Sequence, residues 1–466
     1  MLFNSTVFLQ FFAAFLLLYC LCRNSLTLRN LLVVAASWLF YGWWDVRFLG
    51  LLIFSGCFDF LVGRLLDKTE VPRRRRLILA ASIVVNLSLL GFFKYFNFFL
   101  NSMAVLLGAL HIPFQTRTLA IVLPAGISFY TFQSLGYVMD VYRRQLPPTR
   151  SLLQYLAFVS FFPQLVAGPI HRGHDLLPQF ARPLTITGAK LAEGTWLVIL
   201  GLFKKVVIAD NLAPLVQMVF DGPPSSGAAT AAATVAFAVQ IYGDFSGYSD
   251  IARGLGSVLG FDLARNFALP YFATSLREFW RRWHITLSRW LRDYLYISLG
   301  GNRQGHWRTS VNVLITMLLG GLWHGAAWNF VLWGAWHGVG LMVNRWWQER
   351  AAPAAALSRW FAAPLTLLFV LYGWLLFRAG SFERVCALTR SLTSWNSTPW
   401  LPHYLLCLLI FAAPLLLLEF WQKKTDDELV ILHQPAWLGG LVQGLMLLGI
   451  ILFWEQRAVP FIYFQF

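Results

Sequence analysis

The chain has 466 residues, of which 58% are hydrophobic and only 12% are charged. Soluble globular chains carry about 25% charged residues, so this composition excludes an ordinary water-soluble domain and predicts a protein surrounded by lipid. The formal net charge of +16 lies mainly in short loops between apolar runs. This distribution argues against nucleic-acid binding and indicates anionic membrane lipid as the charged partner.

The sequence offers no recognisable metal site. Its five cysteines are scattered within or beside apolar runs, without the paired spacing of a zinc site. His171 and His174 have no third ligand nearby and are interpreted as two loop histidines. We therefore expect neither a metal nor a bound cofactor.

Apolar runs of membrane-spanning length, or slightly less, recur along the whole chain. Several are short, and we expect some broken or re-entrant helices, which are tolerated where protein or a cavity surrounds them. The pattern predicts a single all-α domain over 1–466 with about 10–12 transmembrane helices and several shorter helices. The candidate spans are 5–22, 31–43, 48–63, 77–100, 119–140, 151–167, 187–209, 228–243, 309–323, 326–344, 360–378, 401–420 and 436–454.

Basic residues indicate how the first spans are oriented. The first apolar run, from Val7 to Cys22, follows no basic residue and has no clear cleavage site, so we expect it to be kept as a span. Arg64, Lys68 and the four arginines at 73–76 form the strongest basic cluster. The positive-inside rule places this loop in the cytosol.

Two aspartates stand out in the segment 240–253, which reads QIYGDFSGYSDIAR. The whole chain has only 21 acidic residues, and Asp244 and Asp250 lie beside an apolar run. We expect them to pair with arginines of the segment 277–292, because a buried charge without a partner is costly. A direct role in proton transfer is the alternative.

The segment 276–301 reads LREFWRRWHITLSRWLRDYLYISLGG and is too charged to span a bilayer. Placed on one helix, it has an apolar stripe and a polar stripe, which predicts a helix lying in the interface or against the cytosolic mouth of the bundle. Two interpretations remain open: a lipid anchor with snorkelling arginines, and a basic collar that receives an anionic donor. The apolar stripe is Phe279, Trp283, Leu287, Trp290 and Tyr294, and the polar stripe is Arg277, Arg281, Ser288 and Arg292.

One histidine lies between two strongly apolar runs, in the stretch GGLWHGAAW at 320–328. Ionisable groups at membrane depth are costly, so His324 is expected to face a cavity or a partner, while the neighbouring glycines permit a close backbone approach or a helix break. Imidazole can take and return a proton near neutral pH, so His324 is either catalytic or a buried structural histidine. His337, in the following run, is interpreted mainly as a packing residue.

These segments, in this order, resemble the membrane-bound O-acyltransferase family, in particular its bacterial branch for alginate and exopolysaccharide O-acetylation. The central matches are YGDFSGYSD at 242–250, REFWRRWHITLSRWLRDYLYISLGGNR at 277–303 and MLLGGLWHGAAWNFVLWGAWHG at 317–338. Further matches are GFFKYFNFF at 91–99, LPAGISFYTFQSLGYVMDVYR at 123–143, FFPQLVAGPIHR at 161–172 and the ending FIYFQF at 461–466.

The resemblance implies a helical bundle around a central funnel, with interfacial and re-entrant helices and a catalytic core over residues 120–345. In such a funnel an acyl thioester arrives from the cytosol, and its acyl group passes through the membrane plane to a hydroxyl. The signature histidine of the family maps onto His324, and His284 is the member of its second polar site. As substrate-binding residues we expect Arg281, Arg282, Trp283, Trp323, Asp244 and Asp250.

The chemistry of His324 agrees with this resemblance. Acyl transfer needs a base for the hydroxyl proton and donors for the developing oxyanion, for which Trp323 and the amides near Gly320, Gly321 and Gly325 are candidates. No serine or cysteine stands beside His324, so direct transfer is expected rather than a covalent acyl-enzyme.

The resemblance therefore implies an O-acyltransferase that moves acetyl groups across the bacterial inner membrane for an extracytoplasmic polysaccharide such as alginate, directly or by relay to a periplasmic partner. The donor is expected to be acetyl-CoA or an acylated carrier protein, and the resemblance implies periplasmic acetyltransferases as protein partners. Two alternatives remain: a D-alanyl transferase that uses a carrier protein, and a transporter for an acyl or sugar-lipid cargo. Many transporters are built from two related halves, and we recognise no repeat between the halves of this sequence, which disfavours the transporter.

Overall fold

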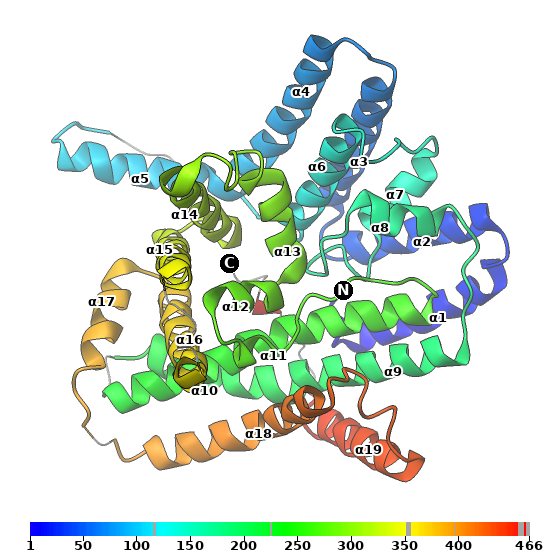
Figure 1. Ribbon diagram of the computed structural model, residues 1–466. Helices are drawn as coiled ribbons and strands as arrows, with labels where there is room; N and C mark the ends of the chain where they lie inside the picture. The colour runs from blue at the N-terminus through cyan, green and yellow to red at the C-terminus, as the bar shows by residue number, and fades with distance from the viewer. Residues whose placement is uncertain (115–117, 224–225, 351–355, 397, 455–460, 463–466) are drawn as a thin grey trace. The chain divides into compact units, whose positions relative to one another are not determined.

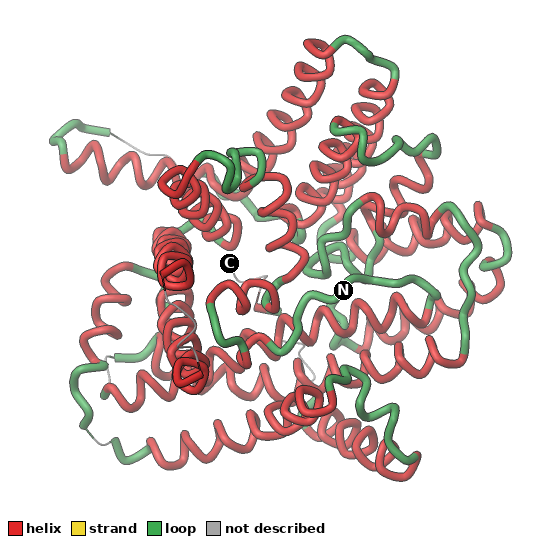
Figure 2. Tube along the Cα trace, viewed as in Figure 1, coloured by secondary structure: helices red, strands yellow, loops and turns green. Residues whose placement is uncertain are grey.

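A computed structural model describes residues 1–114, 118–223, 226–350, 356–396, 398–454 and 461–462. Figure 2 shows helices joined by loops, and no strand occurs among these residues. Helices begin where the sequence supplies a cap: Ser5, Ser25 and Asp45 each accept a hydrogen bond from an N–H of the following first turn. The all-α prediction is confirmed.

The described chain divides into two packed units, of which the first comprises Met1, Ser5–Thr185 and Leu259–Leu263. In this unit a continuous helical stretch, Pro72–Ala109, contains a short π-helical segment. Its elements are α1 (Thr6–Cys22), α2 (Leu26–Gly42), α3 (Val46–Asp67), α4 (Pro72–Leu90), η1 (Gly91–Tyr95), α5 (Phe96–Ala109), α6 (Ile127–Tyr142), α7 (Leu152–Ser160) and α8 (Gly173–Phe180).

Two expected spans of the first unit are shorter than predicted. The run 119–140 is helical only from Ile127, because Gly126 has a left-handed backbone (φ 72°) that interrupts a helix. The run 151–167 is helical only to Ser160, and the chain leaves the helical conformation just before Pro163. Most of 127–140 and of 155–167 is buried in protein, which hydropathy alone does not distinguish from burial in lipid.

Four described helical stretches are long and apolar enough to cross a membrane: Val46–Asp67, Pro72–Ala109, Phe361–Arg378 and Leu401–Thr425. Three shorter apolar helices are Thr6–Cys22, Leu26–Gly42 and Ala436–Leu452. The chain is therefore a multi-pass membrane protein, as predicted. The total of ten to twelve crossings stays a prediction, because broken and short helices do not reveal their depth by length and composition.

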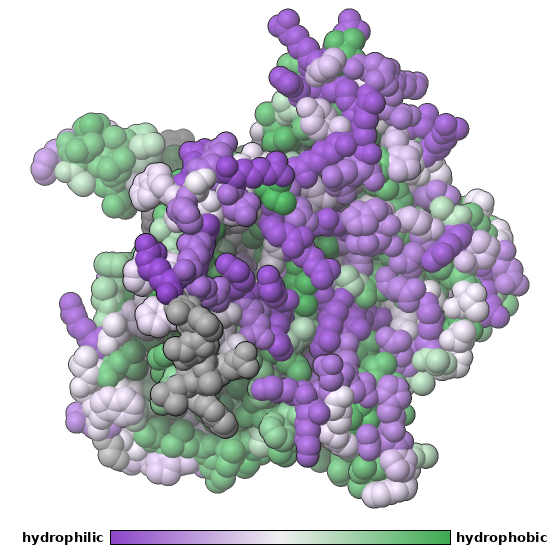
Figure 3. All heavy atoms as spheres, in the orientation of Figure 1, coloured by the Kyte–Doolittle hydropathy of each residue, from purple (hydrophilic) through white to green (hydrophobic). Residues whose placement is uncertain are grey.

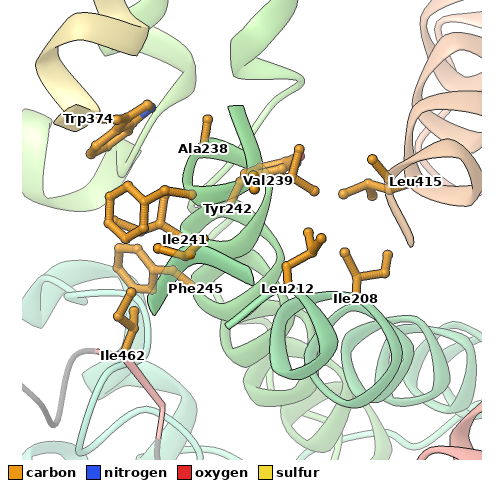
Figure 4. Packing of buried hydrophobic residues seen from close by; sticks show 14 of the residues in the cluster. Ile208, Leu212, Ala238, Val239, Ile241, Tyr242, Phe245, Trp374, Leu415 and Ile462 are labelled. Carbon is orange, nitrogen blue, oxygen red and sulfur yellow. The ribbon is translucent and has the colours of Figure 1, made fainter. Parts of the chain in front are cut away.

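The second unit comprises Leu2–Asn4, Ile186–Val258 and Ala264–Phe466, within the described residues. The 32-residue helix α11 lies at its core, and Figure 4 shows side chains of η2, α10, α16 and α18 around the middle of that helix. The elements are α9 (Gly188–Leu202), η2 (Phe203–Ala209), α10 (Asp210–Phe220), α11 (Gly227–Val258), η3 (Pro270–Phe272), α12 (Leu276–Arg282), α13 (Ile285–Trp290), η4 (Leu291–Tyr296), α14 (Gly305–His324), α15 (Trp328–Arg350), α16 (Ala356–Arg378), α17 (Phe382–Ser391), α18 (Leu401–Thr425) and α19 (Ala436–Leu452).

Glycines bring α9 and α11 into backbone contact, and Figure 1 shows the two helices side by side. A Cβ on Gly201 would lie 2.5 Å from the carbonyl oxygen of Gly247, and a Cβ on Gly194 would lie 2.7 Å from that of Gly254. The glycines recur at matching intervals on both helices, which is the small-residue pattern of close helix pairs in membranes. This contact anchors the core helix of the second unit.

Candidate functional site

His324 is the last residue of α14, in a tight hairpin with α15. Close packing of the two helices requires Gly321 and Gly334, because a Cβ on either would clash with the main chain of the opposite helix. The helix then stops at Gly325, whose backbone is extended and whose missing side chain leaves room for Phe330. Glycines therefore serve both expected purposes here, and they leave the imidazole at a helix end.

A cavity of about 190 Å³ lies between α12, α13, η4, α14 and α15. Most of its walls are apolar, and His324, Arg292, Ser288 and Thr316 are its polar members. The contributing positions of α14 recur at steps of three or four, so one face of that helix forms a wall that ends at His324. The lining residues are Trp280, Leu287, Ser288, Leu291, Arg292, Tyr296, Val313, Thr316, Met317, Gly320, His324, Trp333 and Leu341.

Aromatic rings surround His324, which is only 6% exposed. Its ring centroid lies 5.1 Å from that of Trp323, 5.1 Å from that of Trp333 and 5.4 Å from that of Phe377, each in an edge-to-face arrangement. Such packing fixes the plane of the imidazole and limits water around it. A histidine that faces a cavity on one side and packs against aromatic rings on others is well placed for proton transfer.

His284 lies in the break between α12 and α13, with a left-handed backbone (φ 41°, ψ 55°). Its Nδ1 is 3.2 Å from Asn266 Oδ1, which also accepts hydrogen bonds from the N–H and the hydroxyl of Thr286. Because this amide oxygen is an acceptor, Nδ1 carries the hydrogen of the neutral ring, and Nε2 is its acceptor nitrogen. Asn266 therefore sets the tautomer of His284.

One indole joins the two predicted histidines. The ring of Trp323 lies 5.7 Å from that of His284 and 5.1 Å from that of His324, by centroids. The structure thus brings together three residues that the sequence had singled out. His284 lies between α12 and α13, and Trp323 and His324 lie at the end of α14. His284 is completely buried and does not line the cavity, whereas His324 does.

His337 lies on α15 in a second aromatic cluster. Its ring contacts those of Trp280 at 5.2 Å and Trp333 at 4.8 Å, and Trp333 in turn contacts His324. His337 does not line the cavity, and a Cβ on Gly373 would lie 2.8 Å from its Nε2. This close packing agrees with its interpretation as a packing residue.

The expected pairing of the two aspartates with arginines of the segment 277–292 is wrong, although Asp250 also lies 3.9 Å from Arg253 of its own helix. Lys205 Nζ lies 2.7 Å from Asp244 Oδ1, and Lys204 Nζ lies 2.7 Å from Asp250 Oδ2. The physical reason is that η2 packs on α11 and offers two lysines from within the buried core, while Arg277, Arg281 and Arg289 of α12 and α13 are exposed. Neither aspartate lines the cavity.

The expected continuous helix over 276–301 is also wrong. It is divided into α12, α13 and the π-helical η4, with the break at His284. The apolar stripe nevertheless faces inward, since Phe279, Trp283 and Leu287 are all buried. Because the segment is divided, α12, α13 and η4 can line the cavity from different directions, which one straight helix does not allow. The π-helical form of η4 is also notable, since such segments are frequent at functional sites.

The predicted substrate-binding arginines and tryptophan of this segment lie in three different settings. Arg281 is exposed, and Arg282 donates to Glu278 at 2.7 Å. Trp283 is 1% exposed and packs on Trp374 at 4.7 Å between ring centroids. Partial burial would raise the pKa of Glu278, but hydrogen bonds from Thr274 and the neighbouring Arg282 lower it overall. Glu278 is therefore an ionised partner that holds Arg282.

Four exposed arginines form what we call the arginine collar: Arg277, Arg281, Arg289 and Arg292. Figure 3 shows hydrophilic side chains over this part of the second unit. Arg292 connects the collar to the cavity, because it lines the cavity while its side chain stays 60% exposed. An anion bound at the collar would therefore lie at the edge of the cavity.

Sequence reasoning missed several residues that build the site. Asn266 lies in an irregular loop, where no sequence pattern marks it as functional. Its role in orienting His284 is evident only from the hydrogen bond between the two side chains. Lys204 and Lys205 are two adjacent basic residues within an apolar run. In a membrane protein such lysines usually form ion pairs with buried acidic residues. Trp333 lay inside a quoted motif, but its contact with two histidines required the α14–α15 hairpin.

Comparisons with known proteins agree with this geometry. Residues 143–382 match the MBOAT, membrane-bound O-acyltransferase, family. The chain is 45% identical over 404 residues to the probable alginate O-acetylase AlgI of Azotobacter vinelandii, which covers 85% of this chain and 79% of that protein. It is 33% identical to the peptidoglycan O-acetyltransferase of Helicobacter pylori, over 100% of this chain and 98% of that protein.

A third relative is more distant. The teichoic acid D-alanyltransferase of Streptococcus thermophilus is 28% identical over 48% of this chain and 57% of that protein. The family match contains both His284 and His324 and every element that lines the cavity. It covers about half of the chain, and the first two relatives extend the similarity over most of the remainder. This chain is an O-acyltransferase and belongs to the membrane-bound O-acyltransferase family.

Proposed function

We propose that this chain transfers an acetyl group from a cytosolic thioester through the membrane plane to a hydroxyl acceptor, with His324 as the base. The transfer serves O-acetylation of an extracytoplasmic polysaccharide, either directly or by relay to a periplasmic partner. The observation that carries the proposal is the position of His324, buried at the end of one wall of an apolar cavity that opens beside the arginine collar. A base, a dry acyl site and a cationic entrance are the parts that this reaction needs.

The donor binds through its charge and its acyl end separately. Acetyl-CoA and an acylated carrier protein are both anionic thioesters, and the collar attracts either one. The thioester end enters the cavity, where Leu287, Leu291 and Met317 supply apolar contacts for the acyl group. Because Gly320 also lines this cavity, its missing side chain leaves space beside Leu291.

The transfer step balances without a cofactor. His324 takes the proton of the acceptor hydroxyl while the hydroxyl oxygen forms a bond to the carbonyl carbon of the thioester. The carbon–sulfur bond then breaks, the thiolate leaves and the imidazolium returns the proton to it. The products are an O-acyl ester and a free thiol. His284 acts through Trp323, which packs against both imidazoles, and so positions His324.

The acceptor is argued from the relatives. The relatives at 45% and 33% identity bear names of a probable alginate O-acetylase and a peptidoglycan O-acetyltransferase, and both names describe O-acetylation of a glycan. We propose the bacterial inner membrane as the location, and periplasmic acetyltransferases as partners that pass the group to the polymer. A D-alanyl group as cargo has less support, because that relative matches only about half of the chain.

The test measures polymer-linked acetate in cells that carry wild type, His324→Ala or His306→Ala, with the amount of each protein in the membrane. His306 is the matched control, because it lies at the opposite end of the same helix with its side chain 83% exposed. We expect loss of acetate for His324→Ala alone, by about 100-fold or more for removal of a general base. Retained acetate at a normal protein level would exclude His324 as the base.

A further inference from the structure

Buried ion pairs join η2 and α11 outside the cavity. Lys205 Nζ lies 2.7 Å from Asp244 Oδ1 and 2.8 Å from Asp210 Oδ1, and the Lys205 and Asp244 side chains are 1% and 4% exposed. Charges so deeply buried are stable only when other charges and hydrogen bonds surround them. Asp244 is therefore held in one orientation by Lys205.

The other oxygen of Asp244 binds a distant part of the chain. The main-chain N–H of Ile462 donates to Asp244 Oδ2 at 2.7 Å. Lys205 Nζ also lies 4.6 Å from the centre of the Phe461 ring, and that ring contacts Tyr248 of α11 at 4.9 Å. A hydrogen bond to a charged group, a cation–π contact and a ring contact thus converge on the segment 461–462.

This segment packs toward the histidines. Ile462 is 4% exposed and belongs to the same hydrophobic cluster as Phe245, and Figure 4 shows the two side chains beside each other. The Phe245 ring contacts the imidazole of His284 edge to face, with 4.6 Å between centroids. Ile462 therefore lies behind the ring that supports His284.

We propose that Asp244 is a positioning residue for acyl transfer, because its carboxylate, oriented by Lys205, fixes Phe461–Ile462 behind Phe245 and so holds His284 against Trp323. This inference rests on the proposed function. Asp244 acts from a distance, since it lines no part of the cavity. Its loss leaves the cavity and the arginine collar intact, so the rate of acetyl transfer falls while donor binding is retained.

A labelling experiment tests the anchor without using activity. Ile462→Cys is placed in a full-length variant whose five native cysteines are replaced by alanine, and membranes are treated with N-ethylmaleimide. The introduced thiol is expected to react slowly in this background and about tenfold faster when Asp244→Ala removes the hydrogen bond from its main chain to a buried charged group. Asp250→Ala is the matched control, because Asp250 forms an equally short buried pair between the same two elements.

Three results would overturn the inference. Slow labelling with Asp244→Ala would show that the carboxylate does not hold the segment. Equally fast labelling with Asp250→Ala would show general loosening of η2 and α11. Fast labelling of Asp244→Ala with normal polymer-linked acetate would show an anchor without influence on the site. If Asp244→Ala does not accumulate in the membrane, Asp244→Asn is measured in its place with the same expectation, because it removes the charge and replaces one of the two acceptor oxygens by an NH2 donor.

The activity arm separates this inference from the proposed function. Polymer-linked acetate is expected to fall about tenfold in Asp244→Ala, the smaller loss that displacement of a supporting residue produces compared with removal of the base. Retained acetate in His324→Ala would instead remove the proposed function, whatever the rate of labelling of the introduced thiol. The inference about Asp244 and the proposed function are thus contradicted by different results.

Discussion

His284 and His324 have different surroundings. Hydrogen bonding to Asn266 sets the orientation and tautomer of His284, whose left-handed backbone ends one helix before the next begins. Aromatic rings pack around His324, including those of Trp323 and Trp333. Only His324 lines the cavity, so the two residues have different roles although both are buried.

Replacing His284 with asparagine tests this difference. Asparagine tolerates left-handed backbone better than most residues, so His284→Asn keeps the break between α12 and α13 while removing the ring that packs on Trp323. We predict a fall in polymer-linked acetate of about tenfold to hundredfold, as expected when a reacting group is slightly displaced. A loss as complete as that of His324→Ala would instead give His284 a direct chemical role, as the sequence first suggested.

Element boundaries in this chain follow from contacts that no local pattern contains. The apolar stripe expected over 276–301 is present, and its members Phe279 and Leu287 are buried in protein. The break at His284 was not predicted, because it depends on Asn266 and on Phe245, which come from other elements. Likewise, the burial of Asp244 and Asp250 was inferred from their apolar surroundings, but their lysine partners became clear only once η2 lay against α11.

The α9–α11 contact offers a prediction about assembly. Gly201→Leu would place a large side chain against the carbonyl of Gly247, where even a Cβ lies at 2.5 Å. Overpacking typically costs about 1–3 kcal/mol, and here the obstacle is main chain, which does not move aside. We expect the variant to lose its monodisperse peak in detergent size-exclusion chromatography.

A control for this change is Gly444→Leu on α19, where a Cβ would meet nothing within 4 Å. It is expected to elute like wild type. If Gly201→Leu also elutes normally and keeps its melting temperature, the close approach of α9 and α11 is not required for the fold.

The loop between α18 and α19 gives a prediction about pH. Burial would raise the pKa of Glu428, but the cations Arg253 and Arg265 lower it below its usual value of 4.5. Glu428 therefore stabilises the folded state above pH 4.5, and this contribution is lost as the pH falls through the lowered pKa. Glu428→Gln should destabilise the protein by about 1.5–3 kcal/mol near pH 7.

Melting temperatures in detergent measure this effect. The difference between wild type and Glu428→Gln is expected to be largest near neutral pH and to shrink as the pH is lowered below 4.5. A difference that stays constant over this range would show that the lost contact is steric and does not depend on the charge of Glu428.

At the scale of the whole molecule, charge is distributed by function. Each of the four long apolar stretches contains an 18-residue window with at most two ionisable residues, whereas exposed arginines gather in the collar and in the run at the start of α4. Composition alone predicted the membrane protein, and the family motifs predicted the reaction class. Neither could decide whether the collar anchors lipid or receives the donor, because both uses need exposed arginines beside an aromatic stripe.

The double variant Arg277→Gln, Arg281→Gln separates these two uses of the collar. If the collar receives the donor, the KM for acetyl-CoA rises by about twofold to thirtyfold, since two exposed ion pairs contribute about 0.2–1 kcal/mol each. The turnover rate stays unchanged because His324 and the cavity are untouched, and added salt reduces the difference from wild type by screening. The matched control, Arg73→Gln with Arg74→Gln, removes two exposed arginines of α4. An equal rise of KM in the control would reveal a general surface charge effect, whereas an unchanged KM with less membrane-bound protein would establish the collar as a lipid anchor.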